Sequence, residues 1–360
     1  MIYLLLLFLC IIAFQNSQKS PQRQKIFAFV FLVTLMILVG IRDPSVGVDS
    51  ERYADKLYFV KDFTLTSYEP LFQISINFVN SLWGSVLVWF VYLSFLAYVF
   101  YIISVLKFSA NPILSVLVFM ISFSHIFPDT MNNLRQGISI MILLLTYLLA
   151  SQRKWLPCIP LFLLAAGFHM SSWFVLPFYY ICQRDFTKDK VIMILTLTFL
   201  FGFVSSEILN LSVISQGLSL TSGVFMEGIE KYAGYTLGAH VLNWAGIITV
   251  MLPINILCYL LIPNEKDEES YKYLFNFYFW GVVIGNLIVG SVSFGMRYMV
   301  MFLVVESILV AYKYKKSKQL RQFLVFMVLF YCYYLWGISN RTDPGMIIPY
   351  KVNPEFFRLF

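Results

Sequence analysis

The sequence predicts an all-α, polytopic integral membrane protein that forms one transmembrane domain over residues 1–360. Of the 360 residues, 59% are hydrophobic and only 12% are charged, and the mean hydropathy is +0.76. A soluble domain has about 25% charged residues, so this chain lacks the side chains for a water-facing shell. Its apolar runs have about 15 to 22 residues, which is the length of helices that cross a hydrocarbon core of about 30 Å.

Apolar runs make up most of the chain. No positive charge precedes the first run, no small-residue cleavage site follows it, and its basic neighbours Lys19, Arg23 and Lys25 come afterwards. This pattern favours an uncleaved helix that starts outside, rather than a signal peptide. The runs lie near residues 2–14, 26–41, 85–106, 112–127, 134–150, 155–181, 190–209, 241–262, 273–292, 298–312 and 320–338.

The run at 155–181 is too long for one comfortable crossing, and Gly167, His169 and Ser171 interrupt it. Basic residues flank both of its ends. A single crossing would invert every later loop and place the Lys-rich segment 313–321 outside, against the positive-inside rule. We therefore expect a hairpin that turns near His169 and returns to the cytoplasmic side. The result is about ten full crossings plus one broken or re-entrant hairpin, with both termini outside.

The basic residues support this topology, because 16 of the 26 Lys and Arg residues fall in loops assigned to the cytoplasmic side. The net charge of +7 is therefore attributed to topology and does not indicate a nucleic-acid partner. The long external segments are the loop 42–84, the loop 210–240 and the C-terminal tail 339–360. In the first, residues 50–62 and a helix opened by Pro70 predict amphipathic helices near the outer interface.

Three arginines lie at membrane depth or at the outer ends of apolar runs, where a charge needs a partner or a function. Arg135, in MNNLRQGIS, shares a polar face with Asn132. It is either an anion clamp, since guanidinium fits phosphate with a planar fork, or an interfacial arginine that reaches the lipid head groups. Arg297 and Arg42 have the same two interpretations.

His169 lies at the expected break of the hairpin, in AAGFHMSS. A lone histidine among apolar residues is commonly a hydrogen-bonded packing residue. Because imidazole titrates near neutral pH, proton transfer is the alternative. The other histidines, His125 and His240, and the five cysteines form no metal-ligand spacing with it, so neither a metal nor another cofactor is expected.

Acidic residues concentrate in VGVDSERYADK and just after it. Asp49, Glu51 and Glu69 either form a solvated charged loop or belong to an external site. Asp49-Ser-Glu51 has the form of a cation-binding pair, but one short pair is a weak signal. Glu306 lies within an apolar run, which predicts a buried, protonated acid bonded across helices.

In order along the chain, VGVDSERY, YEPLF, NNLRQGIS, AAGFHMSS, MRYM and IIPY resemble the pattern of EpsG-like proteins, the Wzy-type polymerases of bacterial polysaccharides. The resemblance covers roughly residues 40–350. It implies a membrane-embedded glycosyltransferase of the bacterial inner membrane that acts at the periplasmic or outer face. The growing glycan would pass from its undecaprenyl diphosphate onto a fresh lipid-linked repeat unit of an O-antigen, capsule or exopolysaccharide. A chain-length regulator is an expected protein partner.

This reaction assigns roles to the polar residues. Arg135, helped by Arg297 and Arg42, would stabilise the departing diphosphate. His169 is the favoured proton acceptor for the attacking sugar hydroxyl, with Asp49 orienting the acceptor sugar or the imidazole, and Asp49 is the alternative base. The expected catalytic residues are thus His169, Asp49 and Arg135. The expected substrate-binding residues are Arg42, Glu51, Tyr53, Glu69, Asn132, Gln136, Arg297, Tyr298 and Tyr350.

Two other classes of function remain open at this stage. A flippase for lipid-linked oligosaccharide would also need external cations, although it should carry charges along the whole bundle and a pseudo-repeat. A membrane-bound acyltransferase would use His169 with an acyl donor.

Overall fold

The computed structural model describes residues 2–47, 49–59, 69–123, 126–208, 244–288, 292–339 and 350–357. These residues form helices, and no strand longer than an isolated bridge occurs among them, which confirms the all-α fold class. The chain divides into two compact units. Unit one comprises Met1–Leu176 with Val304–Phe360, and unit two comprises Pro177–Leu303.

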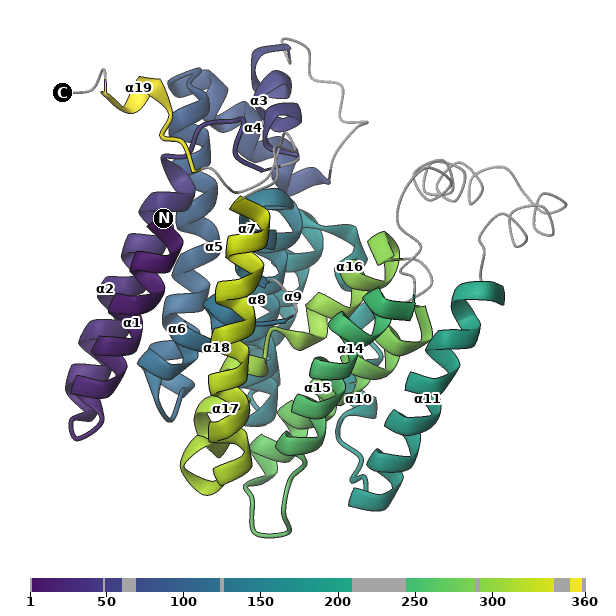
Figure 1. The fold of residues 1–360 in the computed structure, drawn as a ribbon. Coiled ribbons are helices and arrows are strands. Elements are labelled where there is room, and N and C mark those ends of the chain that lie inside the picture. The colour runs from purple at the N-terminus through teal and green to yellow at the C-terminus, as the bar shows by residue number, and fades with distance from the viewer. Residues whose placement is uncertain are drawn as a thin grey trace, which may run out of the picture. The chain divides into compact units, whose positions relative to one another are not determined.

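Unit one contains the two ends of the chain. Its helices are α1 (Ile2–Ser17), α2 (Pro21–Gly40), α3 (Ser50–Phe59), α4 (Pro70–Leu82), α5 (Val86–Phe108), α6 (Pro112–Ile121), α7 (Ile126–Asn132), α8 (Leu134–Ser151), α9 (Trp155–Phe168), the 3-10 helix η1 (Met170–Val175), α17 (Glu306–Lys313), the 3-10 helix η2 (Tyr314–Lys316), α18 (Lys318–Ser339) and α19 (Pro354–Phe357). The short helices α3, α4 and α19 gather at the end of unit one where α2 ends and α5 begins (Figure 1).

Unit two consists of α10 (Phe178–Ile181), α11 (Lys188–Ile208), α14 (Trp244–Leu261), α15 (Glu269–Ile288) and α16 (Val292–Leu303). Amide side chains join three of these helices. Asn255 and Asn286 donate reciprocal hydrogen bonds of 2.8 and 2.9 Å, and Asn286 also donates to the Thr198 hydroxyl at 3.1 Å. Each amide thereby satisfies polar atoms that would be costly to leave unpaired among apolar side chains.

The helix starts follow local sequence rules. Ser20 caps α2 by accepting from the backbone N–H of Arg23 at 3.3 Å, and Pro21 occupies the first helical position. Asn111 caps α6 in the same way, followed by Pro112. These caps set where the chain reverses between neighbouring helices.

The core of unit one is built around α8. This helix packs against α5 and α9 and is buried along most of its length. A short hydrogen bond between the Ser139 and Ser172 hydroxyls links α8 to η1. Glu306 is fully buried at the start of α17, as expected for an acid within an apolar run.

The expected ten crossings are not confirmed. Three helices of the described residues, α2, α5 and α8, are long and apolar enough to cross a membrane, and α6 with α7 makes a fourth if the bent pair is one span. Two expected runs are split in the structure. The run 112–127 ends its first helix at Ile121, where Ser122 takes an extended conformation, and the run 298–312 is divided between α16 and α17.

The break in the run 155–181 occurs where the sequence predicts it. Helix α9 ends at Phe168, His169 is extended with φ −151° and ψ 115°, and η1 follows. The return of this run to the cytoplasmic side stays a prediction. Of the expected external segments, 42–84 contains α3 and α4 as predicted and 350–357 belongs to unit one, whereas the loop 210–240 lies outside the described residues.

Candidate functional site

Two helix ends meet at the site. Glu69 precedes Pro70, the first residue of α4, and His169 follows the last residue of α9. The helices approach closely at Gly167, where an added Cβ would lie only 2.5 Å from Cδ1 of Leu71. An alanine here would have to displace the Leu71 side chain, so glycine favours the close approach between the start of α4 and the end of α9.

Glu69 is the centre of the site. Its Oε1 lies 2.9 Å from Nδ1 of His169 and accepts from the backbone N–H of Met170 at 3.3 Å. Its Oε2 forms a short ion pair with the guanidinium of Arg135. The side chains of Glu69, His169 and Arg135 are 12, 17 and 25% exposed, so the cluster is shielded but still reachable from outside.

The Glu69 carboxyl is ionised. Burial alone raises its pKa, but the hydrogen bond from His169 and the positive charge of Arg135 outweigh burial and lower the pKa to about 2. The N-terminus of α4 also favours a negative charge at this position. An ionised carboxylate only accepts hydrogen bonds, so Nδ1 of His169 is the donor. In the neutral imidazole, Nε2 is then the nitrogen that can accept a proton.

Arg135 is held by aromatic residues as well as by Glu69. Its Nε donates to the Tyr53 hydroxyl at 3.5 Å, and its guanidinium carbon lies 5.9 and 5.7 Å from the ring centres of Tyr53 and Phe72. Such cation–π contacts favour the charged group when it is partly desolvated. We call Glu69, His169, Arg135 and Tyr53 the Glu69 cluster.

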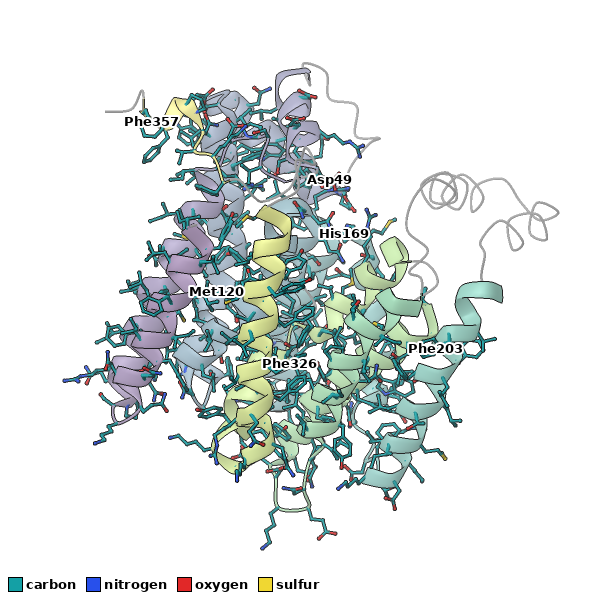
Figure 2. All side chains as sticks on the ribbon, viewed as in Figure 1. Asp49, Met120, His169, Phe203, Phe326 and Phe357 are labelled. Atoms are coloured by element: carbon teal, nitrogen blue, oxygen red, sulfur yellow. The ribbon has the colours of Figure 1, made fainter. Side chains whose placement is uncertain are left out.

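The structure therefore brings together four residues that the sequence nominated separately. Asp49 was expected to orient the acceptor sugar or the imidazole. Its carboxylate lies 3.4 Å from Arg52, three residues later on α3, whereas the carboxylate in contact with the imidazole is Glu69. A contact of Asp49 with the acceptor sugar stays a prediction. Figure 2 labels Asp49 and His169 toward the same end of unit one.

The other candidates of unit one surround the cluster in different ways. Glu51 is exposed in the first turn of α3, and Gln136 is buried on α8 beside Arg135 in sequence. Asn132 ends α7 and approaches Gly47, whose φ of +106° and close neighbours, Asn132 Oδ1 among them, suit only glycine.

Arg42 and Tyr350 bond to the protein itself. Arg42 is fully buried, and its guanidinium donates to backbone carbonyls and to a serine hydroxyl. The Tyr350 hydroxyl donates to the carbonyl of Leu38 at 2.7 Å. Arg297 and Tyr298 lie on α16 in unit two.

Three features of the site were not foreseen from the sequence. They are the carboxylate–imidazole pair, the ring of Phe72 beside Arg135, and the crossing of Gly167 with Leu71. YEPLF and AAGFH hold five of these six residues, all except Arg135, so the motifs marked the right segments. They did not indicate that the two segments touch.

Comparison with known proteins decides the family. The family model for the EpsG family matches residues 25–352. The chain belongs to the EpsG family. Its members are Wzy-type polysaccharide polymerase-like proteins. The matched range includes all four residues of the Glu69 cluster. No curated protein and no solved structure gives a significant match to it.

Proposed function

We propose that this EpsG family protein is a polysaccharide polymerase of the inner membrane that joins undecaprenyl-diphosphate-linked repeat units at the periplasmic or outer face. The observation that supports it most is the Glu69 cluster, which sets a proton acceptor and a fixed guanidinium on the two oxygens of one carboxylate. Glycosyl transfer from a lipid diphosphate needs both functions.

His169 is the proposed base. The acceptor hydroxyl attacks the anomeric carbon of the growing glycan, the bond from that carbon to the diphosphate oxygen breaks, and the hydroxyl proton passes to Nε2 of His169. Glu69 accepts the Nδ1–H at 2.9 Å, which fixes the tautomer and stabilises the imidazolium that forms. The imidazolium later returns its proton to water, which restores the neutral base.

Arg135 is the proposed partner of the departing diphosphate. Guanidinium stays protonated while the leaving group gains negative charge, and its planar fork matches phosphate oxygens. Glu69 and the Tyr53 ring hold it in place before the reaction, so little reorganisation is needed when the charge develops.

The surroundings of His169 support a lipid-linked substrate. Met170 and Trp173 follow it in η1, and they are 64 and 49% exposed although both are large and apolar. The Trp173 ring packs edge-on against Phe162 of α9 at 5.3 Å, which holds it at this surface. A ligand that contacts the Glu69 cluster together with Met170 and Trp173 needs a polar head and an apolar chain.

Polymerisation by purified protein in proteoliposomes tests the proposal. Lipid-linked repeat units are added outside, and glycan length is measured for the wild type, for His169→Gln, for Glu51→Gln and for Asp55→Asn. We expect long chains with the wild type and only single units with His169→Gln. Asp55→Asn, an exposed carboxylate of α3 outside the expected site residues, is the matched control and should also give long chains, whereas shortening in Glu51→Gln would support the expected substrate contact of Glu51. Wild-type protein that moves the units across the bilayer without lengthening them is a flippase. Transfer of an acyl group instead makes it an acyltransferase.

A further inference from the structure

Arg42 is a fully buried cation that joins segments far apart in the sequence. Its Nη2 donates to the carbonyl of Met131 at 2.9 Å and to the Ser50 hydroxyl at 3.2 Å. Its Nε donates to the carbonyl of Val46 at 3.3 Å, and its Nη1 donates to the carbonyl of Val39. The guanidinium also stacks on the ring of Phe90, 4.6 Å from the ring centre.

These bonds connect the segments that carry two members of the Glu69 cluster, Arg135 and Tyr53. Met131 lies near the end of α7, four residues before Arg135, and Ser50 begins α3, which holds Tyr53 three residues later. The Ser50 hydroxyl also donates to the Met131 carbonyl at 3.2 Å, so the three groups close a ring of hydrogen bonds. Displacing Arg42 would release α3 and the junction of α7 with α8 together.

The C-terminal segment 350–357 also binds at Arg42, through the backbone. Val352 forms an antiparallel bridge with Arg42, in which Asp43 N–H donates to the Lys351 carbonyl at 2.9 Å and Asn353 N–H donates to the Ile41 carbonyl at 2.8 Å. The Ser85 hydroxyl, at the start of α5, donates to the Glu355 carboxylate at 2.7 Å. In Figure 1, α19 lies at the end of unit one where α2 ends and α5 begins.

We infer that Arg42 is a positioning residue, clamped by the C-terminal segment 350–357, that sets Arg135 and Tyr53 in register with Glu69. This inference rests on the proposed function. It replaces the substrate-binding role expected for Arg42, because its guanidinium donates to the carbonyls of Val39, Val46 and Met131 and to the Ser50 hydroxyl, and its side chain is inaccessible.

Buried guanidinium suits this role better than lysine does. Burial lowers the pKa of Arg42 to about 10, yet the group stays protonated at neutral pH. Its several N–H donors reach carbonyls in different directions at once, which a single ammonium group cannot do. Arg42→Lys thus keeps the positive charge but cannot make these several hydrogen bonds at once.

The main test compares Arg42→Lys and Ser50→Ala with the wild type in the proteoliposome assay. A shift of about 1 Å in a catalytic group lowers a rate by about 100-fold, so we expect Arg42→Lys to lose about that much kcat. Its KM for the lipid-linked unit should stay within a factor of about 2, because Arg42 touches no substrate. Ser50→Ala, which removes one member of the ring, should give a smaller fall in kcat.

A backbone substitution tests whether the C-terminal segment 350–357 holds Arg42 in place. Asn353→Pro removes the N–H that bonds to Ile41, whereas Lys351→Ala changes only an exposed side chain of the same segment and is the matched control. We expect Asn353→Pro to resemble Arg42→Lys and the control to resemble the wild type.

A second measurement does not depend on the reaction. Arg52 is an exposed trypsin site on α3, and loosening this helix should speed cleavage there in Arg42→Lys and Asn353→Pro. If the wild type does not polymerise but trypsin cleaves Arg42→Lys and Asn353→Pro faster at Arg52, the proposed function fails and the structural role of Arg42 is supported. If the wild type polymerises and Arg42→Lys raises KM at unchanged kcat and unchanged cleavage, Arg42 binds substrate and the inference is wrong. Wild-type kinetics and cleavage in Arg42→Lys would also overturn it.

Discussion

Replacing Glu69 by glutamine should stop polymerisation and remove a pH-dependent part of the stability of the protein. The shift of the Glu69 pKa from its ordinary 4.5 to about 2 is worth about 3 kcal/mol, at about 1.4 kcal/mol per pKa unit. The side chain is only 12% exposed, so solvent screens this contribution little.

The sign of the pH dependence follows from the direction of the shift. A carboxyl whose pKa is lower in the folded protein adds stability that is complete above the unfolded pKa of 4.5. That stability is lost as the pH falls through about 2. The difference in unfolding free energy between wild type and Glu69→Gln should therefore shrink as the pH falls below about 4.5. Thermal unfolding in detergent at several pH values measures this difference.

The loss of activity has a separate cause. A glutamine side chain can donate its N–H to Nδ1 of His169, which favours the tautomer with a proton on Nε2 and removes the base. The wrong tautomer in a carboxylate–histidine pair costs about 10⁴ in kcat. Asp49→Asn is the comparison variant, because Asp49 is the rival carboxylate and pairs with Arg52 instead. Normal kcat in Glu69→Gln, or an equal loss in Asp49→Asn, would refute the assignment of Glu69 as the carboxylate that orients the base.

Three further predictions follow from the geometry and the charge pattern. Gly167→Ala should lower kcat by about 10- to 100-fold by pushing α4 away from α9, and Leu71→Ala should restore much of it, since Leu71 holds the atoms that the new Cβ would meet. Arg135→Lys should impair polymerisation while the protein accumulates normally in the membrane, which blotting checks, because lysine keeps the charge without the planar fork. In a cysteine-free background, an impermeant thiol reagent on spheroplasts should label a cysteine at Lys351 and not one at Ser317; the reverse pattern would overturn the topology.

Local rules predicted the parts of the fold that depend on neighbours in sequence. The helix at Pro70 begins where proline favours a first turn, and the predicted helix 50–62 corresponds to α3, with Tyr53 and Leu57 on its buried face. The break at His169 also follows from local composition. The number of membrane crossings does not follow from local composition. An apolar run has the same composition whether it forms one helix or two, as it does on either side of Ser122.

The pairing of Glu69 with His169 depends on a tertiary contact that no local pattern encodes. The two residues are 100 positions apart, and they meet because α4 crosses α9 at a residue without a Cβ. Charge pattern alone favoured Asp49 as the partner of the imidazole, because Asp49 belongs to the acidic cluster VGVDSERYADK, and it gave Glu69 only a substrate-binding role. The geometry separates them. Asp49 has Arg52 within one helical turn, whereas Glu69 stands where one helix begins and another ends, so its carboxylate reaches both the imidazole and Arg135. A buried carboxylate is stable when hydrogen-bond donors or cations satisfy its oxygens. The two oxygens of Glu69 contact the imidazole and the guanidinium in this way, so one carboxylate serves both the base and Arg135.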